Sequence, residues 1–242
     1  MELMSDGVFD IIVTSPPYDD LRTYNGNINQ WNEEKWRKII KNSLRILKNG
    51  GVMIWIVSDE TANGSETGTS FKQALWAKEC GFNIHDTMIW NKENFTAVGS
   101  LKTRYAPVFE YMFVFSKGKP KTFNPIKDRI NKSSGRKRSG SIRTKNGKTK
   151  PLSNYSRDIP KYGQRHNVWN MPPEMSETKR FHPAQFPEKL IEDHIKSWSN
   201  EGDIVLDPFL GSGTSGICCK KLNRQFVGIE LDEEYYNIAY KR

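Results

Sequence analysis

The sequence has few cysteines, and their number and spacing exclude several classes of protein. Its 242 residues include three cysteines, which form neither a Cys-x-x-Cys pair nor a disulfide framework. A small odd number suits a reducing compartment, so we expect neither a disulfide-stapled fold nor a bound metal ion. The three are Cys80, Cys218 and Cys219.

Long apolar runs are also lacking. No stretch approaches the roughly 20 apolar residues that cross a bilayer, and residues 1–6 lack the basic and apolar regions of a signal peptide. We therefore expect a cytoplasmic protein without membrane attachment, acting as a monomer or homodimer. The mean hydropathy of -0.71 is polar for an enzyme, yet 12% aromatic residues are too many for a disordered chain. The chain is long enough to fold around one sizeable core.

Acidic residues are scarce in one part of the chain, where positive charge is concentrated. The formal net charge is +9, but residues 117–165 alone hold sixteen Lys or Arg against two Asp. Such a block attracts a polyanion, because each cation that neutralises a phosphate releases condensed counterion. By itself, a run such as Arg136-Lys137-Arg138 is explained almost as well by a solvated loop or a localisation tract. Residues 131–154 contain almost no apolar side chain, so we expect them to stay unordered until nucleic acid binds.

Elsewhere, strand and helix patterns alternate. Apolar runs predict strands and helical spacing predicts helices. The expected strands are 8–13, 52–57, 82–90, 111–115, 203–207 and 226–231; the expected helices are 31–47, 71–80, 187–198, 214–222 and 233–241. Asn49-Gly50-Gly51 is expected to end the first helix, and strand 111–115 to run antiparallel to the one before it. The alternation predicts an α/β fold with a mostly parallel sheet and helices on both faces.

A glycine-bearing turn follows strand 203–207. Gly211 and Gly213 allow a ligand to approach the backbone where a Cβ would clash. The next strand leads to Glu230, a position at which a carboxylate accepts hydrogen bonds from ribose hydroxyls. A nucleotide-like cofactor is therefore expected, although two glycines alone often mark only a helix entry. The turn differs from the GxGxxG fingerprint, which makes a nicotinamide cofactor the weaker hypothesis.

Strand 8–13 runs into a second notable loop, Thr14-Ser15-Pro16-Pro17-Tyr18. The two prolines stiffen it and hold the Pro16 carbonyl in place. That carbonyl and the Ser15 hydroxyl can accept both hydrogens of an aromatic amine and draw its nitrogen toward tetrahedral geometry. The Tyr18 ring offers a face for a base rotated out of a duplex. Taken alone, the loop is better explained as a rigid turn with Tyr18 in the core; the glycine turn reverses that preference.

The two loops resemble those of the DNA amino-methyltransferases, which combine a (Ser/Asp/Asn)-Pro-Pro-(Tyr/Phe/Trp) segment with Asp-Pro-Phe-x-Gly-Ser-Gly-Thr. The order here, catalytic loop first and cofactor loop last with a basic insertion between them, is similar to the circularly permuted β class. The resemblance spans essentially the whole chain. It implies a Rossmann-like methyltransferase fold, S-adenosylmethionine as cofactor, double-stranded DNA as substrate, and a cognate restriction endonuclease as a partner in a restriction-modification system.

The resemblance also assigns residues to roles. The catalytic set is Ser15, Pro16, Pro17 and Tyr18. The cofactor set is Asp207, Pro208, Phe209, Gly211, Ser212, Gly213, Thr214 and Glu230, with His182, Pro183 and Phe186 at the methionine end. The basic side chains expected to bind DNA are Arg136, Lys137, Arg138, Arg143, Lys145 and Lys148. Residues 1–116 then form the catalytic half of the core, 117–165 the target-recognition insertion, and 166–242 the cofactor-binding half.

The target base and two rival functions stay open. Ser15, where Asp is usual in adenine-N6 enzymes, favours cytosine N4, but either side chain accepts from an amine. One rival is a related enzyme acting on RNA or on a protein glutamine; the basic insertion favours DNA. Another is a catalytically impaired DNA-binding protein on the same scaffold, against which the intact cofactor loop speaks. No cysteine nucleophile is needed, because the amine attacks the methyl group directly.

In one respect the chain departs from the family pattern. Members normally have a strand ahead of the catalytic loop, ending near the cofactor adenine, whereas nine residues precede Asp10. Nor is a strand expected after helix 233–241. The chain is therefore expected to be shortened at its start, and whether one wall of the adenine pocket is complete stays open.

Overall fold

The computed structural model describes residues 1–18, 31–94, 101–173 and 186–242. These fall into two units. Unit 1 comprises the described parts of 1–124 and 167–242, and unit 2 comprises residues 125–166. Within the described ranges, no helix is long and apolar enough to cross a membrane.

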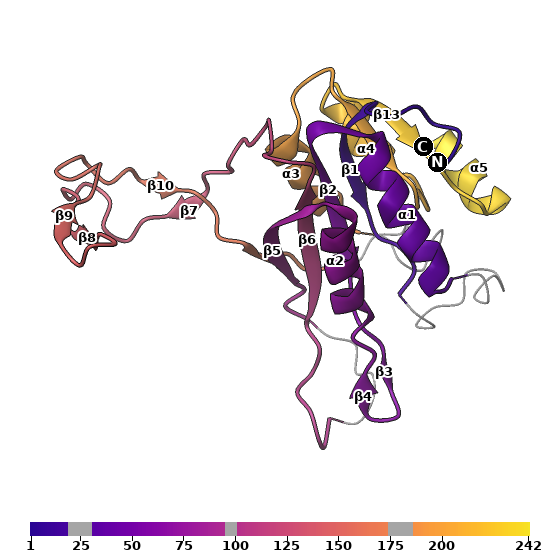
Figure 1. The fold of residues 1–242 in the computed structure, drawn as a ribbon, viewed down its shortest axis with the longest axis horizontal. Helices are drawn as coiled ribbons and strands as arrows, with labels where there is room; N and C mark the ends of the chain where they lie inside the picture. Colours follow the sequence, from indigo (N-terminus) through magenta and orange to yellow (C-terminus); the bar gives the residue numbers. More distant parts are fainter. Residues whose placement is uncertain (19–30, 95–100, 174–185) are drawn as a thin grey trace. The chain divides into compact units, whose positions relative to one another are not determined.

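Unit 1 is built on a seven-stranded sheet with the order β11-β5-β6-β2-β1-β12-β13 (Figure 1). Its strands are β1 (Phe9–Thr14), β2 (Leu47–Val57), β5 (Asn83–Asn91), β6 (Phe109–Ser116), β11 (Val168–Asn170), β12 (Ile204–Asp207) and β13 (Gln225–Gly228). Strand β6 pairs antiparallel with both neighbours, and the other pairs in this sheet are parallel. The mostly parallel α/β sheet expected from the sequence is confirmed. The three-residue β11 was not anticipated.

Helices connect and cover the sheet. They are α1 (Glu33–Ile46), α2 (Thr69–Cys80), α3 (Glu188–Trp198), α4 (Thr214–Lys221) and α5 (Glu233–Lys241); the short strands β3 (Thr61–Ala62) and β4 (Ser65–Glu66) form a hairpin after β2. Helix α1 lies between β1 and β2 in the chain, and α4 between β12 and β13. These two crossovers run in opposite directions along the sheet, so right-handed connections place α1 and α4 on opposite faces. Helix α2 packs beside α1, and α3 beside α4.

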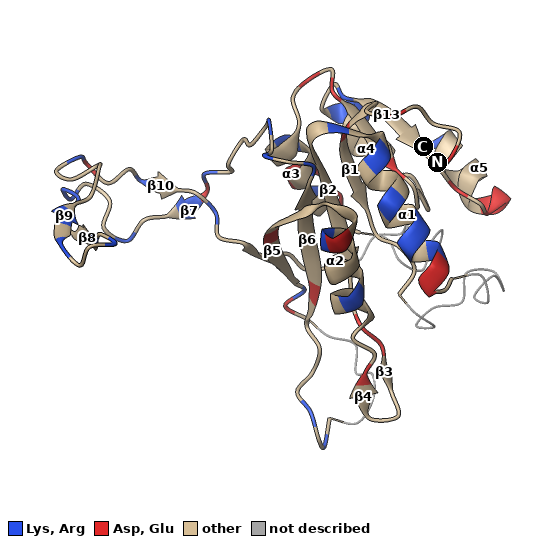
Figure 2. Cartoon of the chain, viewed as in Figure 1, with Lys and Arg blue, Asp and Glu red and all other residues tan. Residues whose placement is uncertain are grey.

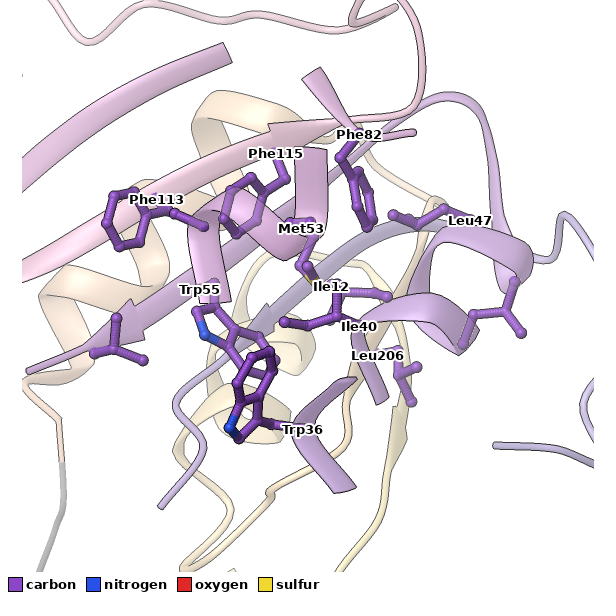
Figure 3. Close-up of a cluster of buried hydrophobic side chains, with 14 of the residues drawn as sticks. Ile12, Trp36, Ile40, Leu47, Met53, Trp55, Phe82, Phe113, Phe115 and Leu206 are labelled. Carbon is purple, nitrogen blue, oxygen red and sulfur yellow. The ribbon is translucent and has the colours of Figure 1, made fainter. Parts of the chain in front are cut away.

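A large apolar cluster fixes the sheet against α1 and α2 (Figure 3). Ile12, Met53 and Trp55 are fully buried on the sheet, and Trp36 and Ile40 reach them from α1. Residues 11–13 of β1 are all fully buried, as expected of a central parallel strand with helices on both faces. The core therefore holds β1 rigidly, and with it the start of the loop that follows.

The prediction that Asn49-Gly50-Gly51 ends the first helix is wrong. Helix α1 already ends at Ile46, and β2 begins at Leu47 and runs through the glycine pair. The register between β1 and β2 shifts at this point, and Gly50, with φ of 83°, donates its N–H to the Lys117 carbonyl. The glycines thus form an irregularity within a strand, where a positive φ is tolerated without a Cβ.

Unit 2 contains two short antiparallel pairs, β7 (Arg129–Ile130) with β10 (Tyr162–Gly163) and β8 (Ser141–Arg143) with β9 (Thr149–Pro151). The expectation that residues 131–154 lack regular structure is therefore wrong. Backbone hydrogen bonds form the β8–β9 hairpin across a turn containing Gly147. Every residue of unit 2 is at least partly exposed, and Lys and Arg recur along its length (Figure 2).

Candidate active site

The two loops singled out from the sequence leave adjacent strands at the same edge of the sheet. Strands β1 and β12 are parallel neighbours, with Ile11 opposite Val205 and Ile12 opposite Leu206. The Ser-Pro-Pro-Tyr loop follows β1, and the glycine turn follows β12. The strand order reverses between these two strands, which is where open α/β sheets bind their ligands. The two loops therefore meet at one edge of the sheet, although they lie far apart in the sequence.

A buried carboxylate ties the loops together. Asp207, at the end of β12, accepts the Thr14 hydroxyl at 2.6 Å although the two residues lie 193 positions apart in the chain. It also accepts the Phe209 N–H at 3.0 Å and the Ser215 hydroxyl at 2.6 Å. Burial raises the pKa of Asp207, and the hydrogen bonds from Ser215 and Thr14 oppose that rise. Asp207 thus joins β1, the glycine turn and α4, a structural role that its place in the cofactor motif did not reveal.

The glycine turn has the backbone form that a nucleotide-like ligand needs. Gly211 and Gly213 have φ of 53° and 87°, which an L side chain adopts only with strain. A Cβ on Gly213 would also lie 3.0 Å from the Ala239 Cβ, so close packing of α5 is a second reason for this glycine. Gly213 is the N-cap of α4 and brings no capping side chain, which leaves amides of the first turn available to a polar ligand group.

Glu230 lies beside this turn. Its Oε2 accepts the Gly211 N–H at 2.7 Å, while Oε1 accepts the N–H groups of Leu231 and Asp232 at 2.9 and 3.0 Å. A carboxylate oxygen has two lone pairs, so Oε2 keeps one for a further donor such as a ribose hydroxyl. The residues present therefore fit the cofactor that the sequence predicts.

Aromatic side chains pack against the turn on the face of the sheet that α1 covers. The Phe209 ring meets Trp31 edge-on at 5.3 Å and Trp55 at 6.4 Å between centroids. Trp55 is fully buried, whereas Trp31 is partly exposed. Trp31 therefore borders the glycine turn, although it belongs to neither of the two sequence motifs.

The catalytic loop is held by hydrogen bonds to a distant strand. The Ser15 hydroxyl donates to the Tyr18 hydroxyl at 2.9 Å, and Tyr18 donates to Glu110 Oε2 at 2.7 Å. Glu110 is the second residue of β6, which begins where its antiparallel neighbours end. Lys92 Nζ lies 2.8 Å from the other oxygen of Glu110. An isolated Glu within a strand of large apolar residues is the sequence signal for a paired carboxylate of this kind.

The other residues of the predicted cofactor set do not all lie at the glycine turn. The Phe186 ring contacts Trp90 on β5 at 5.9 Å, a strand separated from β12 by β6, β2 and β1. Phe186 therefore lies beside β5, and three strands separate β5 from the strand that carries the glycine turn. His182 and Pro183 lie outside the described residues. Pro208, Ser212 and Thr214 lie within the turn and are buried.

The two cysteines of α4 are poorly suited to act as nucleophiles. Cys218 and Cys219 on α4 are both buried, and burial raises the pKa of the Cys219 thiol to about 12. A thiol with such a pKa stays protonated at neutral pH and is a poor nucleophile.

The six basic residues expected to bind DNA all lie in unit 2. Arg136, Lys137, Arg143, Lys145 and Lys148 are exposed, and Arg138 is partly buried. Lys137 pairs with Asp158 at 2.9 Å, with both side chains about 70% exposed; an exposed pair of this kind contributes little and exchanges readily for a phosphate.

Comparison with known proteins identifies the family. Residues 9–241 match the family model described as DNA methylase, which groups N6 and N4 methyltransferases. The chain belongs to this family.

Similar proteins agree with this assignment. The orphan methyltransferase M.BamHII of Bacillus amyloliquefaciens is 47% identical, over 100% of this chain and 91% of its own length. Among solved structures, the PvuII DNA methyltransferase, described as cytosine-N4-specific, has a TM-score of 0.71 at 20% identity, covering 99% of this chain and 80% of its own. A DNA modification methylase from Thermus thermophilus, solved with S-adenosylmethionine, has a TM-score of 0.65 at 21% identity, covering 100% of this chain and 89% of its own.

Family membership confirms the expectations made from the two loops. The chain is a DNA amino-methyltransferase of the N4/N6 family with a Rossmann-like methyltransferase fold. Its cofactor is S-adenosylmethionine, as the family implies.

Proposed function

We propose that this methyltransferase transfers a methyl group to N4 of cytosine in double-stranded DNA. The proposal rests above all on the junction of β1 and β12, where the Thr14–Asp207 hydrogen bond holds the Ser-Pro-Pro-Tyr loop against the glycine turn. A base amine bound at the first loop and a cofactor bound at the second are thereby brought to one place, which is the main requirement of a direct transfer.

The cofactor supplies an electrophilic methyl group when it is bound. Asp207, Phe209, Gly211 and Gly213 form the turn that would hold it, and Glu230 would accept a ribose hydroxyl through its remaining lone pair. His182, Pro183 and Phe186 are proposed for its methionine end on the motif alone.

The catalytic loop binds and orients the base. Ser15 Oγ and the Pro16 carbonyl accept the two amine hydrogens, which localises the nitrogen lone pair and aligns it for attack. Tyr18 presents its ring to the base for stacking, worth about 1–3 kcal/mol per base. Ser15 supports cytosine over adenine, and adenine N6 is the second candidate because a hydroxyl accepts from either amine.

Unit 2 supplies the proposed DNA contacts. Its basic residues, including Arg136, Lys137 and Arg143, are exposed on a unit with no buried core. They would bind phosphates and retain the duplex while unit 1 acts on one base.

The decisive experiment uses the purified protein, S-adenosylmethionine with a labelled methyl group, and plasmid DNA. We expect labelled N4-methylcytosine among the digested nucleosides by mass spectrometry. Labelled N6-methyladenine would replace the cytosine assignment with the adenine one. DNA binding without cofactor binding in calorimetry would instead identify a non-catalytic DNA-binding protein.

The loop assignment has its own test. Ser15→Ala is expected to lower the transfer rate by about 100-fold, the scale of losing one oriented hydrogen bond to the reacting group, without changing cofactor affinity. A Ser15→Ala protein with full activity would contradict the role given to the loop.

A further inference from the structure

A continuous set of hydrogen bonds runs from the catalytic loop to a partly buried ion pair. It comprises Ser15, Tyr18, Glu110 and Lys92, with successive donor–acceptor distances of 2.9, 2.7 and 2.8 Å. The four residues come from three separate parts of the chain: the loop after β1, the start of β6, and the segment after β5. None of these contacts follows from the two sequence motifs.

The ion pair fixes the direction of every bond in this set. The Glu110 side chain is only 6% exposed, and Lys92 is 24% exposed. An ionised carboxylate accepts hydrogen bonds and donates none, so Tyr18 must donate to it. The Tyr18 oxygen then has lone pairs to offer, and Ser15 donates to Tyr18.

A consequence follows for Ser15. A hydroxyl has one hydrogen and two lone pairs. Because its hydrogen is engaged by Tyr18, Ser15 can offer only lone pairs to a third group. It is thus set to accept from an N–H donor and is unsuited to bind a base carbonyl, which needs a donor.

We propose that Glu110 and Lys92 are positioning residues, acting through Tyr18 to hold Ser15 as a hydrogen-bond acceptor for a base amine. This inference rests on the proposed function, since it assigns Ser15 to the amine. The Tyr18 hydroxyl is the group that connects Ser15 to Glu110. A phenylalanine at this position would keep the ring but remove that connection.

The chain offers a matched control at the opposite edge of the sheet. Asp10, at the start of β1, pairs with Lys48 at 2.6 Å and also accepts the Ile204 N–H at 3.0 Å. Glu110→Gln and Asp10→Asn are therefore the same kind of change, an ion-paired acid to its amide. Only the first lies in the proposed set, so the control separates a general loss of stability from a loss of positioning.

The first measurement needs neither cofactor nor DNA. The NMR resonance of the Tyr18 ring carbon that carries the hydroxyl is identified by its disappearance in Tyr18→Phe. We expect Glu110→Gln and Ser15→Ala each to shift this resonance, and Asp10→Asn to leave it in place. An unmoved resonance in Glu110→Gln would overturn the proposal, whatever the protein methylates.

The second measurement is the single-turnover rate of methyl transfer to DNA. Glu110→Gln and Tyr18→Phe are each expected to slow it about tenfold, the scale of one hydrogen bond, with cofactor affinity within about twofold of the native protein. The double variant should be no slower than either single one, because both break the same set. Multiplied losses in the double variant, or a native rate in Glu110→Gln, would count against positioning. A native protein that transfers no methyl group would refute the proposed function, while the NMR measurement would still decide the hydrogen-bond set.

Discussion

The two units of this methyltransferase differ in the interactions that stabilise each of them internally. Unit 1 has a core of large apolar side chains between its sheet and helices, including fully buried Ile12 and Trp55. Unit 2 has no buried residue and consists of short strand pairs rich in Lys and Arg. The difference shows that apolar burial can stabilise the unit that holds the site while the basic unit has almost no buried apolar side chains. Substitutions that change the free energy of unfolding and substitutions that change DNA affinity should therefore fall in different units.

The largest expected contrast comes from deleting the same side chain in each unit. Ile12→Ala in β1 removes a fully buried side chain and should lower the free energy of unfolding by about 2–5 kcal/mol. Ile142→Ala in β8 removes one that is 44% exposed and should change it by less than about 0.5 kcal/mol. Urea unfolding of the two variants measures both values. Equal destabilisation would break the comparison.

Removing positive charge should have a large effect on DNA affinity in unit 2 and a small one in unit 1. The triple substitution of Arg136, Lys137 and Arg138 by alanine is expected to weaken DNA binding about 100-fold near 0.2 M salt and to reduce the salt slope by about 3. Cofactor affinity and thermal stability should stay unchanged. The control replaces Lys41, Lys72 and Lys220, exposed residues of unit 1. If this control weakens binding to the same extent, net charge rather than unit 2 governs affinity.

The smallest expected effect concerns pH. Burial raises the pKa of Asp207 in the folded chain, so the folded state holds this proton more tightly than the unfolded state does. Its contribution to stability is therefore greatest below the unfolded pKa of about 3.9 and is lost as the pH rises through the folded value. The native protein should lose stability relative to Asp207→Asn as the pH rises from about 4 toward 7. Urea unfolding of both proteins across this range gives the difference, and a native protein that instead gains stability relative to the variant would contradict the sign.

Much of unit 1 could be predicted because its elements are marked locally. Residues 11–13 are apolar because β1 is buried on both faces at these positions. Helix α2 ends at Cys80, and its C-cap Gly81 has a φ of 115° that favours glycine. The glycine pair after α1 was misread because the same residues can end a helix or form an irregularity in a strand. Only the pairing of β2 with β1 and β6 decides between these outcomes.

The candidate site was predictable in its motifs but not in its supporting contacts. Asp207 and Ser15 were found because each lies in a short signature, and the parallel strands imply that their loops share an edge. Glu110, Lys92 and Trp31 reach the loops through tertiary packing, which leaves no fixed spacing in the sequence. In unit 2, composition predicted charge correctly but not the β8–β9 hairpin, since backbone hydrogen bonds do not depend on apolar side chains.

The position of β1 in the middle of the sheet has a consequence for synthesis. One neighbour, β2, follows within a few dozen residues, whereas the other, β12, begins at Ile204. During translation the side of β1 that faces β12 must wait for most of the chain to leave the ribosome, with its backbone donors and acceptors unpaired in the meantime. A chaperone that shields this strand during translation would then protect the nascent chain from pairing with other chains.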